Sequence, residues 1–424
     1  MLILLAMLIL LFLFTSVPIF ISLGLGAFLS VLLLSDTQPM VLIQRLFGGI
    51  DQFSLMALPF FILAANLMDG GGLSDRILRF SRALVGHLAG GIALTAQVAS
   101  MFFGALSGSS PATVIAIGKV MYPELIRGGY GKSFSGGLLA SAGAISLIIP
   151  PSITLIIFGS VTGVSVGKLF IAGIGAGLVM GFVSIIYIYL YAKREKLPRD
   201  KRASGKEVGR TFLQAFWALM IPVIILGGIY TGIFSPTEAA GVSAIYALFV
   251  GLFIYRELNF KSIFSICKES AITSAQVLVL VAAAQVLGWV LTRERLPQLV
   301  VEVITENIHS AWMFLLVLNI ILLLMGMFME GVAAIIVTAP LVYPAAMALG
   351  IDPVHLGVVV IANLAIGMYT PPFGMNIFVT QTITKIGLSE MMPGIFRFLA
   401  VNLVGLLLVT YIPELSLFLV NLLN

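Results

Sequence analysis

The chain has 424 residues, of which 60% are hydrophobic and only 10% are charged. Soluble domains usually carry about 25% charged residues, so this composition excludes a soluble enzyme, a disordered protein and a secreted disulfide-bonded scaffold. The net charge is +5, and the basic residues form no stripe with interleaved aromatic residues. We therefore expect an all-α polytopic membrane protein with no nucleic-acid partner, whose positive charges set its topology.

The first half of the chain predicts a scaffold segment followed by one repeat. A membrane-spanning helix needs about 20 apolar residues. Residues 1–52 begin with an uncharged run to Leu34, in which Pro18 marks either a kink or a tight connection, and they are expected to form scaffold spans and an arm. Residues 53–193 are expected to form, in order, a span at 53–68, an interfacial amphipathic helix at 70–87, a hairpin at about 88–124, a broken helix at about 133–166 and a span at 169–191.

The second half repeats this order after a strongly basic connection. Between Lys193 and Arg210 the chain carries eight Lys and Arg residues against three acids, so we expect the loop at 194–210 to lie in the cytoplasm. Residues 211–270 are expected to form two further scaffold spans and a polar segment. The second repeat, 271–424, is expected to contain a span at 271–291, an amphipathic stretch at 292–309, a hairpin at about 309–349, a broken helix at about 354–384 and a last apolar run.

The two halves match at a constant offset of 221 residues. At this offset Tyr122-Pro123 falls on Tyr343-Pro344, and Pro150-Pro151 falls on Pro371-Pro372. Four spans separate the two Pro-Pro breaks, so with a cytoplasmic loop the first broken helix runs from inside to outside and the second runs back. The sequence therefore predicts inverted-topology repeats with two re-entrant hairpins and two broken helices, the architecture of secondary transporters with sites near the membrane midplane.

The break in the first hairpin has the residues of a binding site. Irregular backbone at membrane depth persists only where it lines a cavity or is buried in protein. Gly108 permits unusual dihedral angles, and Pro111 can begin a helix whose N-terminus attracts an anion. We therefore expect substrate binding by three neighbouring hydroxyls, those of Ser107, Ser109 and Ser110. A Ser/Gly patch for helix packing is the alternative interpretation.

The Pro-Pro pairs predict two cation sites. Proline cannot donate a backbone hydrogen bond, so Pro150 and Pro151 release carbonyls one turn earlier, around Ser146 and Leu147. Released carbonyls with neighbouring hydroxyls suit a hard cation that prefers oxygen ligands. The same arrangement recurs around Thr370, and two breaks at equivalent positions favour a pair of Na+ sites over two simple proline kinks.

Two charged residues are further candidates for substrate binding. Glu330 is the single acid in the run 311–349, and a lone charge near the bilayer centre costs about 2.5–3.5 kcal/mol on insertion scales. It is expected to favour a cation, carry a proton or face the substrate, whereas pairing with a neighbouring subunit or exposure in an aqueous cleft is the alternative. Arg293 ends the span at 271–291 and suits bidentate carboxylate recognition, although a terminal arginine also serves as an interfacial anchor.

Several segments together carry a family resemblance. Residues 232–241, GIFSPTEAAG, and residues 103–112, FGALSGSSPA, together with the paired Pro-Pro breaks, resemble the large membrane subunit of tripartite ATP-independent periplasmic (TRAP) transporters. The resemblance covers essentially the whole chain. It implies an elevator-type transporter, similar to the divalent anion/Na+ symporters, that works in the bacterial inner membrane with a small four-helix membrane subunit and a periplasmic substrate-binding protein.

The resemblance also implies the residues of the ion sites. The hairpin and break sites of the family map onto 107–110 with 146–151, and onto 326–331 with 368–375; the acid that is often Asp in the family is Glu330 here. The implied Na+ ligands of the first half are Ser107, Gly108, Ser146, Ile149 and Pro150. Those of the second half are Gly326, Glu330, Met368, Thr370 and Met375.

These features together predict a Na+-coupled importer in the lipid bilayer. Its expected substrate is a carboxylate, either sialic acid or a C4-dicarboxylate, delivered by the periplasmic binding protein and moved by an elevator motion. The alternative is a stand-alone Na+- or H+-coupled carboxylate symporter of the divalent anion/Na+ symporter type. An enzyme is not expected, because the sequence contains no Walker A motif and no visible Ser/His/Asp or Cys/His set.

Overall fold

The computed structural model describes residues 1–15, 17–308 and 310–423 of the chain. Within these ranges all regular structure is helical, and 7 helices are long and apolar enough to span a membrane. The expected all-α polytopic class is therefore confirmed. Residues 309 and 424, at which two expected boundaries fall, lie outside the described residues.

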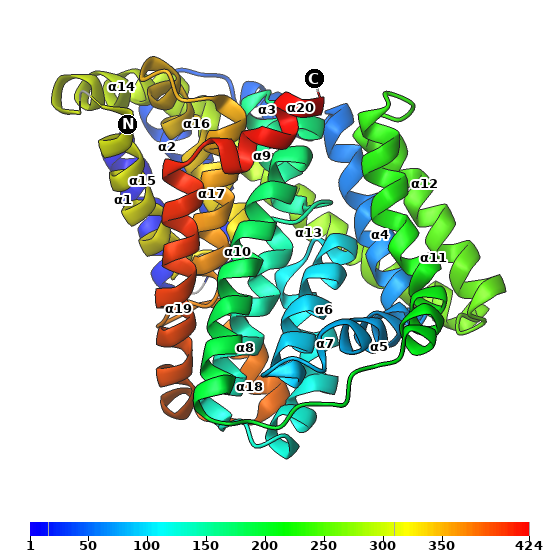
Figure 1. Cartoon of the computed structure of the whole chain (residues 1–424). Coiled ribbons are helices and arrows are strands. Elements are labelled where there is room, and N and C mark those ends of the chain that lie inside the picture. The colour runs from blue at the N-terminus through cyan, green and yellow to red at the C-terminus, as the bar shows by residue number, and fades with distance from the viewer. Residues whose placement is uncertain (16, 309, 424) are drawn as a thin grey trace.

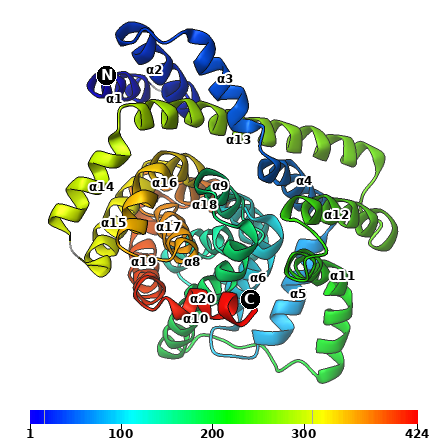
Figure 2. The same ribbon diagram turned by 90° about the horizontal axis from the view of Figure 1, so that it is seen from above.

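We divide the helices into two groups, the scaffold and the hairpin domain, and in Figure 1 scaffold helices lie on both sides of the hairpin domain. The scaffold consists of α1 (Leu2–Phe14), α2 (Ile19–Leu34), α3 (Pro39–Ile50), α4 (Ala57–Gly70), α5 (Leu73–Val85), α11 (Gly205–Tyr230), α12 (Pro236–Phe249), α13 (Phe260–Arg293) and α14 (Leu296–Asn307). The hairpin domain consists of α6 (Gly91–Ser107), α7 (Ser110–Arg127), α8 (Lys132–Ala144), α9 (Ile153–Thr162), α10 (Val166–Arg194), α15 (Ala311–Gly326), α16 (Gly331–Ala348), α17 (Pro353–Gly367), α18 (Met375–Thr384), α19 (Leu388–Tyr411) and α20 (Glu414–Leu423). Seen from above in Figure 2, α13 runs between helices α1–α3 and the hairpin domain.

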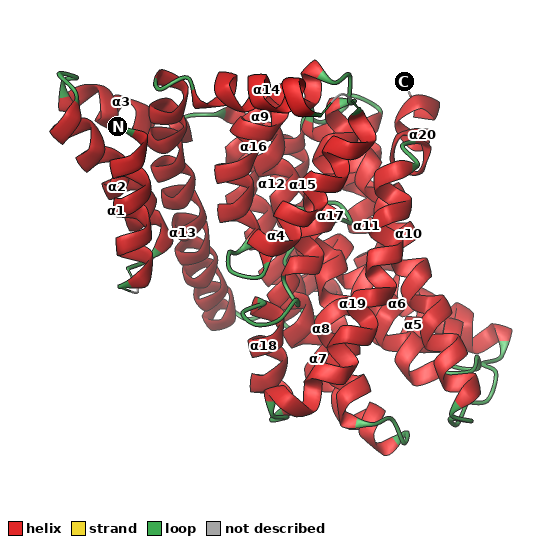
Figure 3. Ribbon diagram, turned by 90° about the vertical axis from the view of Figure 1, so that its left-hand side faces the viewer, coloured by secondary structure: helices red, strands yellow, loops and turns green. Residues whose placement is uncertain are grey.

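The hairpin domain contains two inverted repeats. The hairpins are α6–α7 and α15–α16, and the broken helices are α8–α9 and α17–α18. The repeats interlock, because α9 packs against α16 of the other repeat and α18 packs against α7. Figure 3 shows α14 lying across one end of the molecule and α7 and α18 at the other end. Both broken helices pass through a cis Pro-Pro peptide bond, at Pro150-Pro151 and Pro371-Pro372.

Three elements differ from the expected boundaries. The N-terminal apolar run forms two helices that pack on each other, with Pro18 as the N-cap of α2, so the tight connection is the correct alternative. Helix α11 begins at Gly205, inside the loop expected at 194–210. Helix α13 begins at Phe260 and continues through the expected polar segment, because Asn259 and Ser262 form a capping box and no proline interrupts the helix.

The segment at 232–241 is a helix start that fixes the scaffold. Ser235 is the N-cap of α12, Pro236 occupies its first turn, and Glu238 completes a capping box by accepting the Ser235 backbone N–H at 2.8 Å. The Thr237 hydroxyl donates to the Phe53 carbonyl at 2.9 Å, which ties α12 to the start of the α4 segment. The structural role of this motif is therefore to position two scaffold helices.

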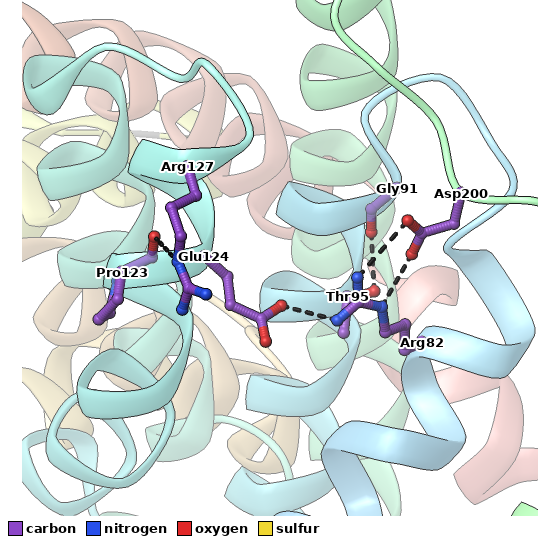
Figure 4. Close-up of polar contacts among 7 residues, drawn as sticks. All are labelled: Arg82, Gly91, Thr95, Pro123, Glu124, Arg127 and Asp200. Atoms are coloured by element: carbon purple, nitrogen blue, oxygen red, sulfur yellow. Dashed lines mark hydrogen bonds and ion pairs between the residues drawn. The ribbon is translucent and has the colours of Figure 1, made fainter.

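Helix α5 connects the scaffold to the hairpin domain. Arg76 pairs with Glu257 of the scaffold at 2.7 Å and lies over the Tyr255 ring. Two turns later, Arg82 donates at 2.8 Å both to Glu124 at the end of α7 and to Asp200 in the basic loop (Figure 4). The hydrogen bond to Asp200 raises the pKa of Arg82, which therefore stays charged and joins three segments.

Candidate functional site

A cavity of about 110 Å³, which we call the hairpin cavity, lies where the tips of the two hairpins meet α13. The first tip contributes Gly108, Ser109, Ser110 and Pro111, and the second contributes Glu330, Gly331 and Val332. The breaks contribute Leu147, Ile153, Thr154 and Met368, and α13 contributes Thr273 and Val277. Both repeats and the scaffold therefore share this one cavity.

The first hairpin tip is held by a close approach and by a bond across the repeats. Gly108 has φ +56°, and a Cβ on it would lie 2.5 Å from the Pro151 carbonyl oxygen, so the tip packs directly on the first break. The Ser110 hydroxyl donates to Asn376 Oδ1 at 2.9 Å, and Asn376 Nδ2 donates to the Ala140 carbonyl at 2.8 Å. Asn376 thus links the first hairpin to both broken helices.

Oxygen atoms cluster at the first break. The Leu147 carbonyl, which the helix interruption releases, accepts from the Ser152 hydroxyl at 2.5 Å and from the Thr154 hydroxyl at 3.1 Å. The two hydroxyl oxygens are 2.8 Å apart. The Ser146 hydroxyl turns back to the Gly143 carbonyl at 2.7 Å. The break therefore gathers one carbonyl and two hydroxyl oxygens beside the cavity, a donor set that suits a hard cation.

The second break is packed against the second hairpin by two glycines. The Cβ that an alanine would add at Gly326 would lie 2.8 Å from the Cα of Gly367, so the helix backbones touch. The Thr370 hydroxyl donates to the Ile366 carbonyl at 2.8 Å, and the Asn376 N–H donates to the Met368 carbonyl at 2.8 Å. This side of the site is closed by backbone contacts.

The charge pattern of the cavity is unusual for an anion site. Glu330 is the one charged side chain among the described residues that line it, and none of them is Lys or Arg. Three helices begin at its wall, α7 at Ser110, α9 at Ile153 and α16 at Gly331. Helix N-termini carry a partial positive charge and free N–H groups. An anion here would meet helix dipoles and hydroxyls but no basic side chain.

The structure brings only some of the predicted site residues together. Gly108, Ser109, Ser110, Glu330 and Met368 line the cavity. The Ser107 hydroxyl faces Thr113 instead. The other predicted ion-site residues do not line the cavity; they are Ser146, Ile149, Pro150, Gly326, Thr370 and Met375. Arg293 lies in another cavity, which also contains Arg45. The sequence did not single out Thr273 and Val277, because they lie in an uninterrupted span with no motif.

Comparison with known proteins identifies the family. Residues 5–415 match the family described as "Tripartite ATP-independent periplasmic transporter, DctM component". The chain belongs to this family. The C4-dicarboxylate TRAP transporter large permease protein DctM of Pseudomonas aeruginosa is 44% identical over 400 residues, which cover 94% of each chain. The sialic acid TRAP transporter large permease protein SiaM of Vibrio cholerae is 36% identical over 407 residues, which cover 96% of this chain and 95% of that protein.

A solved structure supports the fold independently of sequence. The YdaH transporter of Alcanivorax borkumensis matches with a TM-score of 0.63 at 15% identity, and the match covers 89% of each chain. The DctM-family chain is therefore a multi-pass membrane permease and not an enzyme. The TRAP family resemblance that the sequence motifs carried is confirmed.

Proposed function

We propose that the chain is the large subunit of a Na+-coupled TRAP transporter of the bacterial inner membrane, which imports a C4-dicarboxylate. The 44% identical relative from Pseudomonas aeruginosa, which is named as a C4-dicarboxylate permease, supports the substrate class. Sialic acid is the substrate named for the 36% identical relative, so it is the second candidate. The word tripartite in the family description supports two partners, a small four-helix membrane subunit and a periplasmic binding protein.

The observation that carries the coupling proposal is the absence of a basic side chain among the described residues of the hairpin cavity. A dicarboxylate would bring two negative charges beside Glu330. Buried charges are strongly unfavourable unless they are paired. Cations that bind with the substrate would supply the missing positive charge, and this requirement couples the two.

The first break offers the best-defined cation ligands. The oxygens of Leu147, Ser152 and Thr154 already lie 2.5–3.1 Å from one another. If the two hydroxyls turn their hydrogens away and the oxygens move slightly apart, a small cation takes the place of the hydrogen bonds between them, and both hydroxyls keep their protons. No cluster of His, Cys, Asp or Glu that could hold a metal ion occurs in the part of the chain that the structure describes. Oxygen ligands without a cluster of acids favour a weakly bound monovalent cation such as Na+ over a tightly held divalent metal.

The division into scaffold and hairpin domain supports an elevator movement. All cavity residues belong to the hairpin domain except Thr273 and Val277. If the hairpin domain slides along α13, the hairpin tips and the two breaks travel with the substrate while the α13 residues that face them change. Each Na+ that enters with the substrate adds about 2.3 kcal/mol of driving force per 100 mV of membrane potential.

Uptake into proteoliposomes tests the proposal. The chain would be reconstituted with its small subunit and binding protein, under Na+ or K+ gradients, and offered succinate or sialic acid. We expect succinate uptake that requires both Na+ and the binding protein. Uptake without the binding protein would favour a stand-alone symporter. Uptake driven by a proton gradient in K+ would assign coupling to Glu330, the single acid of the cavity, and would overturn the Na+ proposal.

A further inference from the structure

A second cavity, of about 530 Å³, lies farther along α13; we call it the outer cavity. Its scaffold wall contains Arg45 of α3 and the polar side chains of Gln285 and Arg293 of α13, with the Trp289 indole. Its opposite wall is apolar and belongs to the hairpin domain. That wall contains Val161 of α9 and Ile336 and Pro340 of α16.

The outer cavity and the hairpin cavity lie along the same three helices. Helices α9, α13 and α16 line both of them. On α13 the lining residues recur every three or four positions, which places them on one face of the helix. The residues with this spacing are Thr273, Val277, Val281, Ala284, Gly288 and Thr292, and beside them Gln285, Trp289 and Arg293 also line the outer cavity. At a rise of about 1.5 Å per residue, Thr273 and Gly288 are about 22 Å apart along this face.

The outer cavity has the positive charge that the hairpin cavity lacks. Arg45 and Arg293 are both exposed, and neither is paired with a carboxylate among the described residues. The Arg293 guanidinium donates to Ser35 Oγ at 2.6 Å and to Thr37 Oγ1, and it lies 5.5 Å from the centre of the Trp289 ring. These neutral contacts orient Arg293 and leave its charge uncompensated.

The position of Arg45 is fixed by packing. A Cβ on Gly49, one turn after Arg45 on α3, would lie 2.2 Å from the Gln285 side chain, so α3 packs directly on α13 at this level. The two arginines therefore come from two scaffold helices that are held together beside one cavity. Arginine suits bidentate binding of carboxylates, and an accessible pair of uncompensated guanidinium groups raises the local concentration of anions.

We propose that the outer cavity is a second carboxylate site, in which Arg45, Gln285 and Arg293 hold the substrate anion before the hairpin tips and their cations receive it. The identity of the anion rests on the proposed function. The site belongs to the scaffold, so the anion is released from it when the hairpin domain moves away along α13. It binds without Na+, because its own guanidinium groups supply the positive charge.

Trp289 provides a direct readout of binding. The chain has three tryptophans, so the substitutions Trp217→Phe and Trp312→Phe leave Trp289 as its single tryptophan, and any tryptophan of the small subunit would likewise be replaced by phenylalanine. The full chain with its small subunit, in nanodiscs of zwitterionic lipid and in Na+-free K+ buffer, would be titrated with succinate. We expect a saturable change of Trp289 fluorescence, and no change with succinamide, which has the same shape without charge.

Variants of the arginines decide whether the change arises from this site. We expect Arg45→Gln and Arg293→Gln each to weaken succinate binding about tenfold or more. A charge-assisted hydrogen bond typically raises binding affinity by at least about tenfold. Arg295→Gln is the matched control, because Arg295 is exposed two residues away and does not line the cavity. Equal affinities for all three variants and the unsubstituted chain would overturn the proposal.

Two further outcomes separate this proposal from its rivals. A fluorescence change caused by anionic lipid in the nanodisc, with none caused by succinate, would assign the arginines to lipid headgroups and overturn the proposal. Because the titration contains no Na+ and measures no uptake, it is independent of the transport assay. A protein that binds succinate here but shows no Na+-dependent uptake would retain the outer site and lose the proposed coupling.

Discussion

Replacing Gly367 by alanine tests how closely the second hairpin must pack on the second broken helix. An ideal Cβ on Gly367 would lie 2.5 Å from the Gly326 Cα and 2.8 Å from its carbonyl carbon. Real Cβ contacts are essentially never shorter than 3.0 Å, and here both partners are backbone atoms that no rotamer change can remove. Helices α15 and α17 must therefore separate by roughly 0.5–1 Å in the variant.

Two opposing terms set the expected magnitude. Alanine favours a helix over glycine by about 1 kcal/mol, whereas overpacking a close contact costs about 1–3 kcal/mol. Because the backbone cannot yield locally, we expect a net loss of about 1–2 kcal/mol. Met368, the next residue, lines the hairpin cavity. A displacement of about 1 Å in a positioned site lowers rates by up to about 100-fold, so we expect transport to suffer more than stability.

The assay combines thermal unfolding in detergent with Na+-driven uptake in proteoliposomes. Gly227→Ala is the matched control, since Gly227 lies inside α11 and its Cβ would meet nothing within 4 Å. We expect the control to be at least as stable as the unsubstituted chain and fully active. If Gly367→Ala matches Gly227→Ala in both thermal stability and Na+-driven uptake, the close contact between Gly367 and Gly326 does not limit either property.

Three further predictions concern charged and titratable groups. Glu330→Gln should raise the Na+ concentration for half-maximal uptake about tenfold, because Glu330 is the single acid among the described residues that line the hairpin cavity. An unchanged Na+ concentration would show that Glu330 takes no part in cation binding. Arg82→Gln should loosen α5 from α7 and so broaden the distribution of distances between spin labels at Arg79 and Lys119. The free energy of unfolding should fall by at most about 1 kcal/mol, because the Arg82 side chain is 44% exposed. An identical distance distribution would contradict this prediction. Burial raises the pKa of Tyr130 to about 12, above the value of about 10 in the unfolded chain. The contribution of the Tyr130 phenol to stability is therefore complete below pH 10 and is lost as the pH rises towards 12. Tyr130→Phe should reduce the loss of thermal stability at alkaline pH, and an unaltered pH profile would show that other groups cause this loss.

The repeat architecture was predictable because proline and glycine interrupt an otherwise uniform apolar sequence. Pro150-Pro151 and Pro371-Pro372 mark the two breaks, and Gly108 and Gly331 begin or flank the hairpin tips. The four spans between the two breaks predicted that the repeats are inverted, and the charge excess at 194–210 predicted which side of the membrane is cytoplasmic. These signals come from residues that are neighbours along the chain, so they can be read from one sequence alone.

The composition of the cavity was less predictable, because it depends on contacts between distant elements. Asn376 bonds to Ser110, 266 residues away, and no periodicity indicates such a pair. Thr273 lines the cavity while Arg293 does not, although both lie on α13. A helix places residues along its axis in a known way, but only the packed structure shows which turn meets the hairpin tips.

We propose that bound cations make the hairpin cavity able to hold an anion. The most direct measurement is calorimetric titration of succinate into the reconstituted Arg45→Gln/Arg293→Gln chain with its small subunit, in Na+ and in K+ at equal ionic strength. We expect saturable binding in Na+ and none in K+. Binding of equal affinity in both buffers would show that the helix N-termini and hydroxyls hold the anion without Na+, and would overturn the proposed coupling.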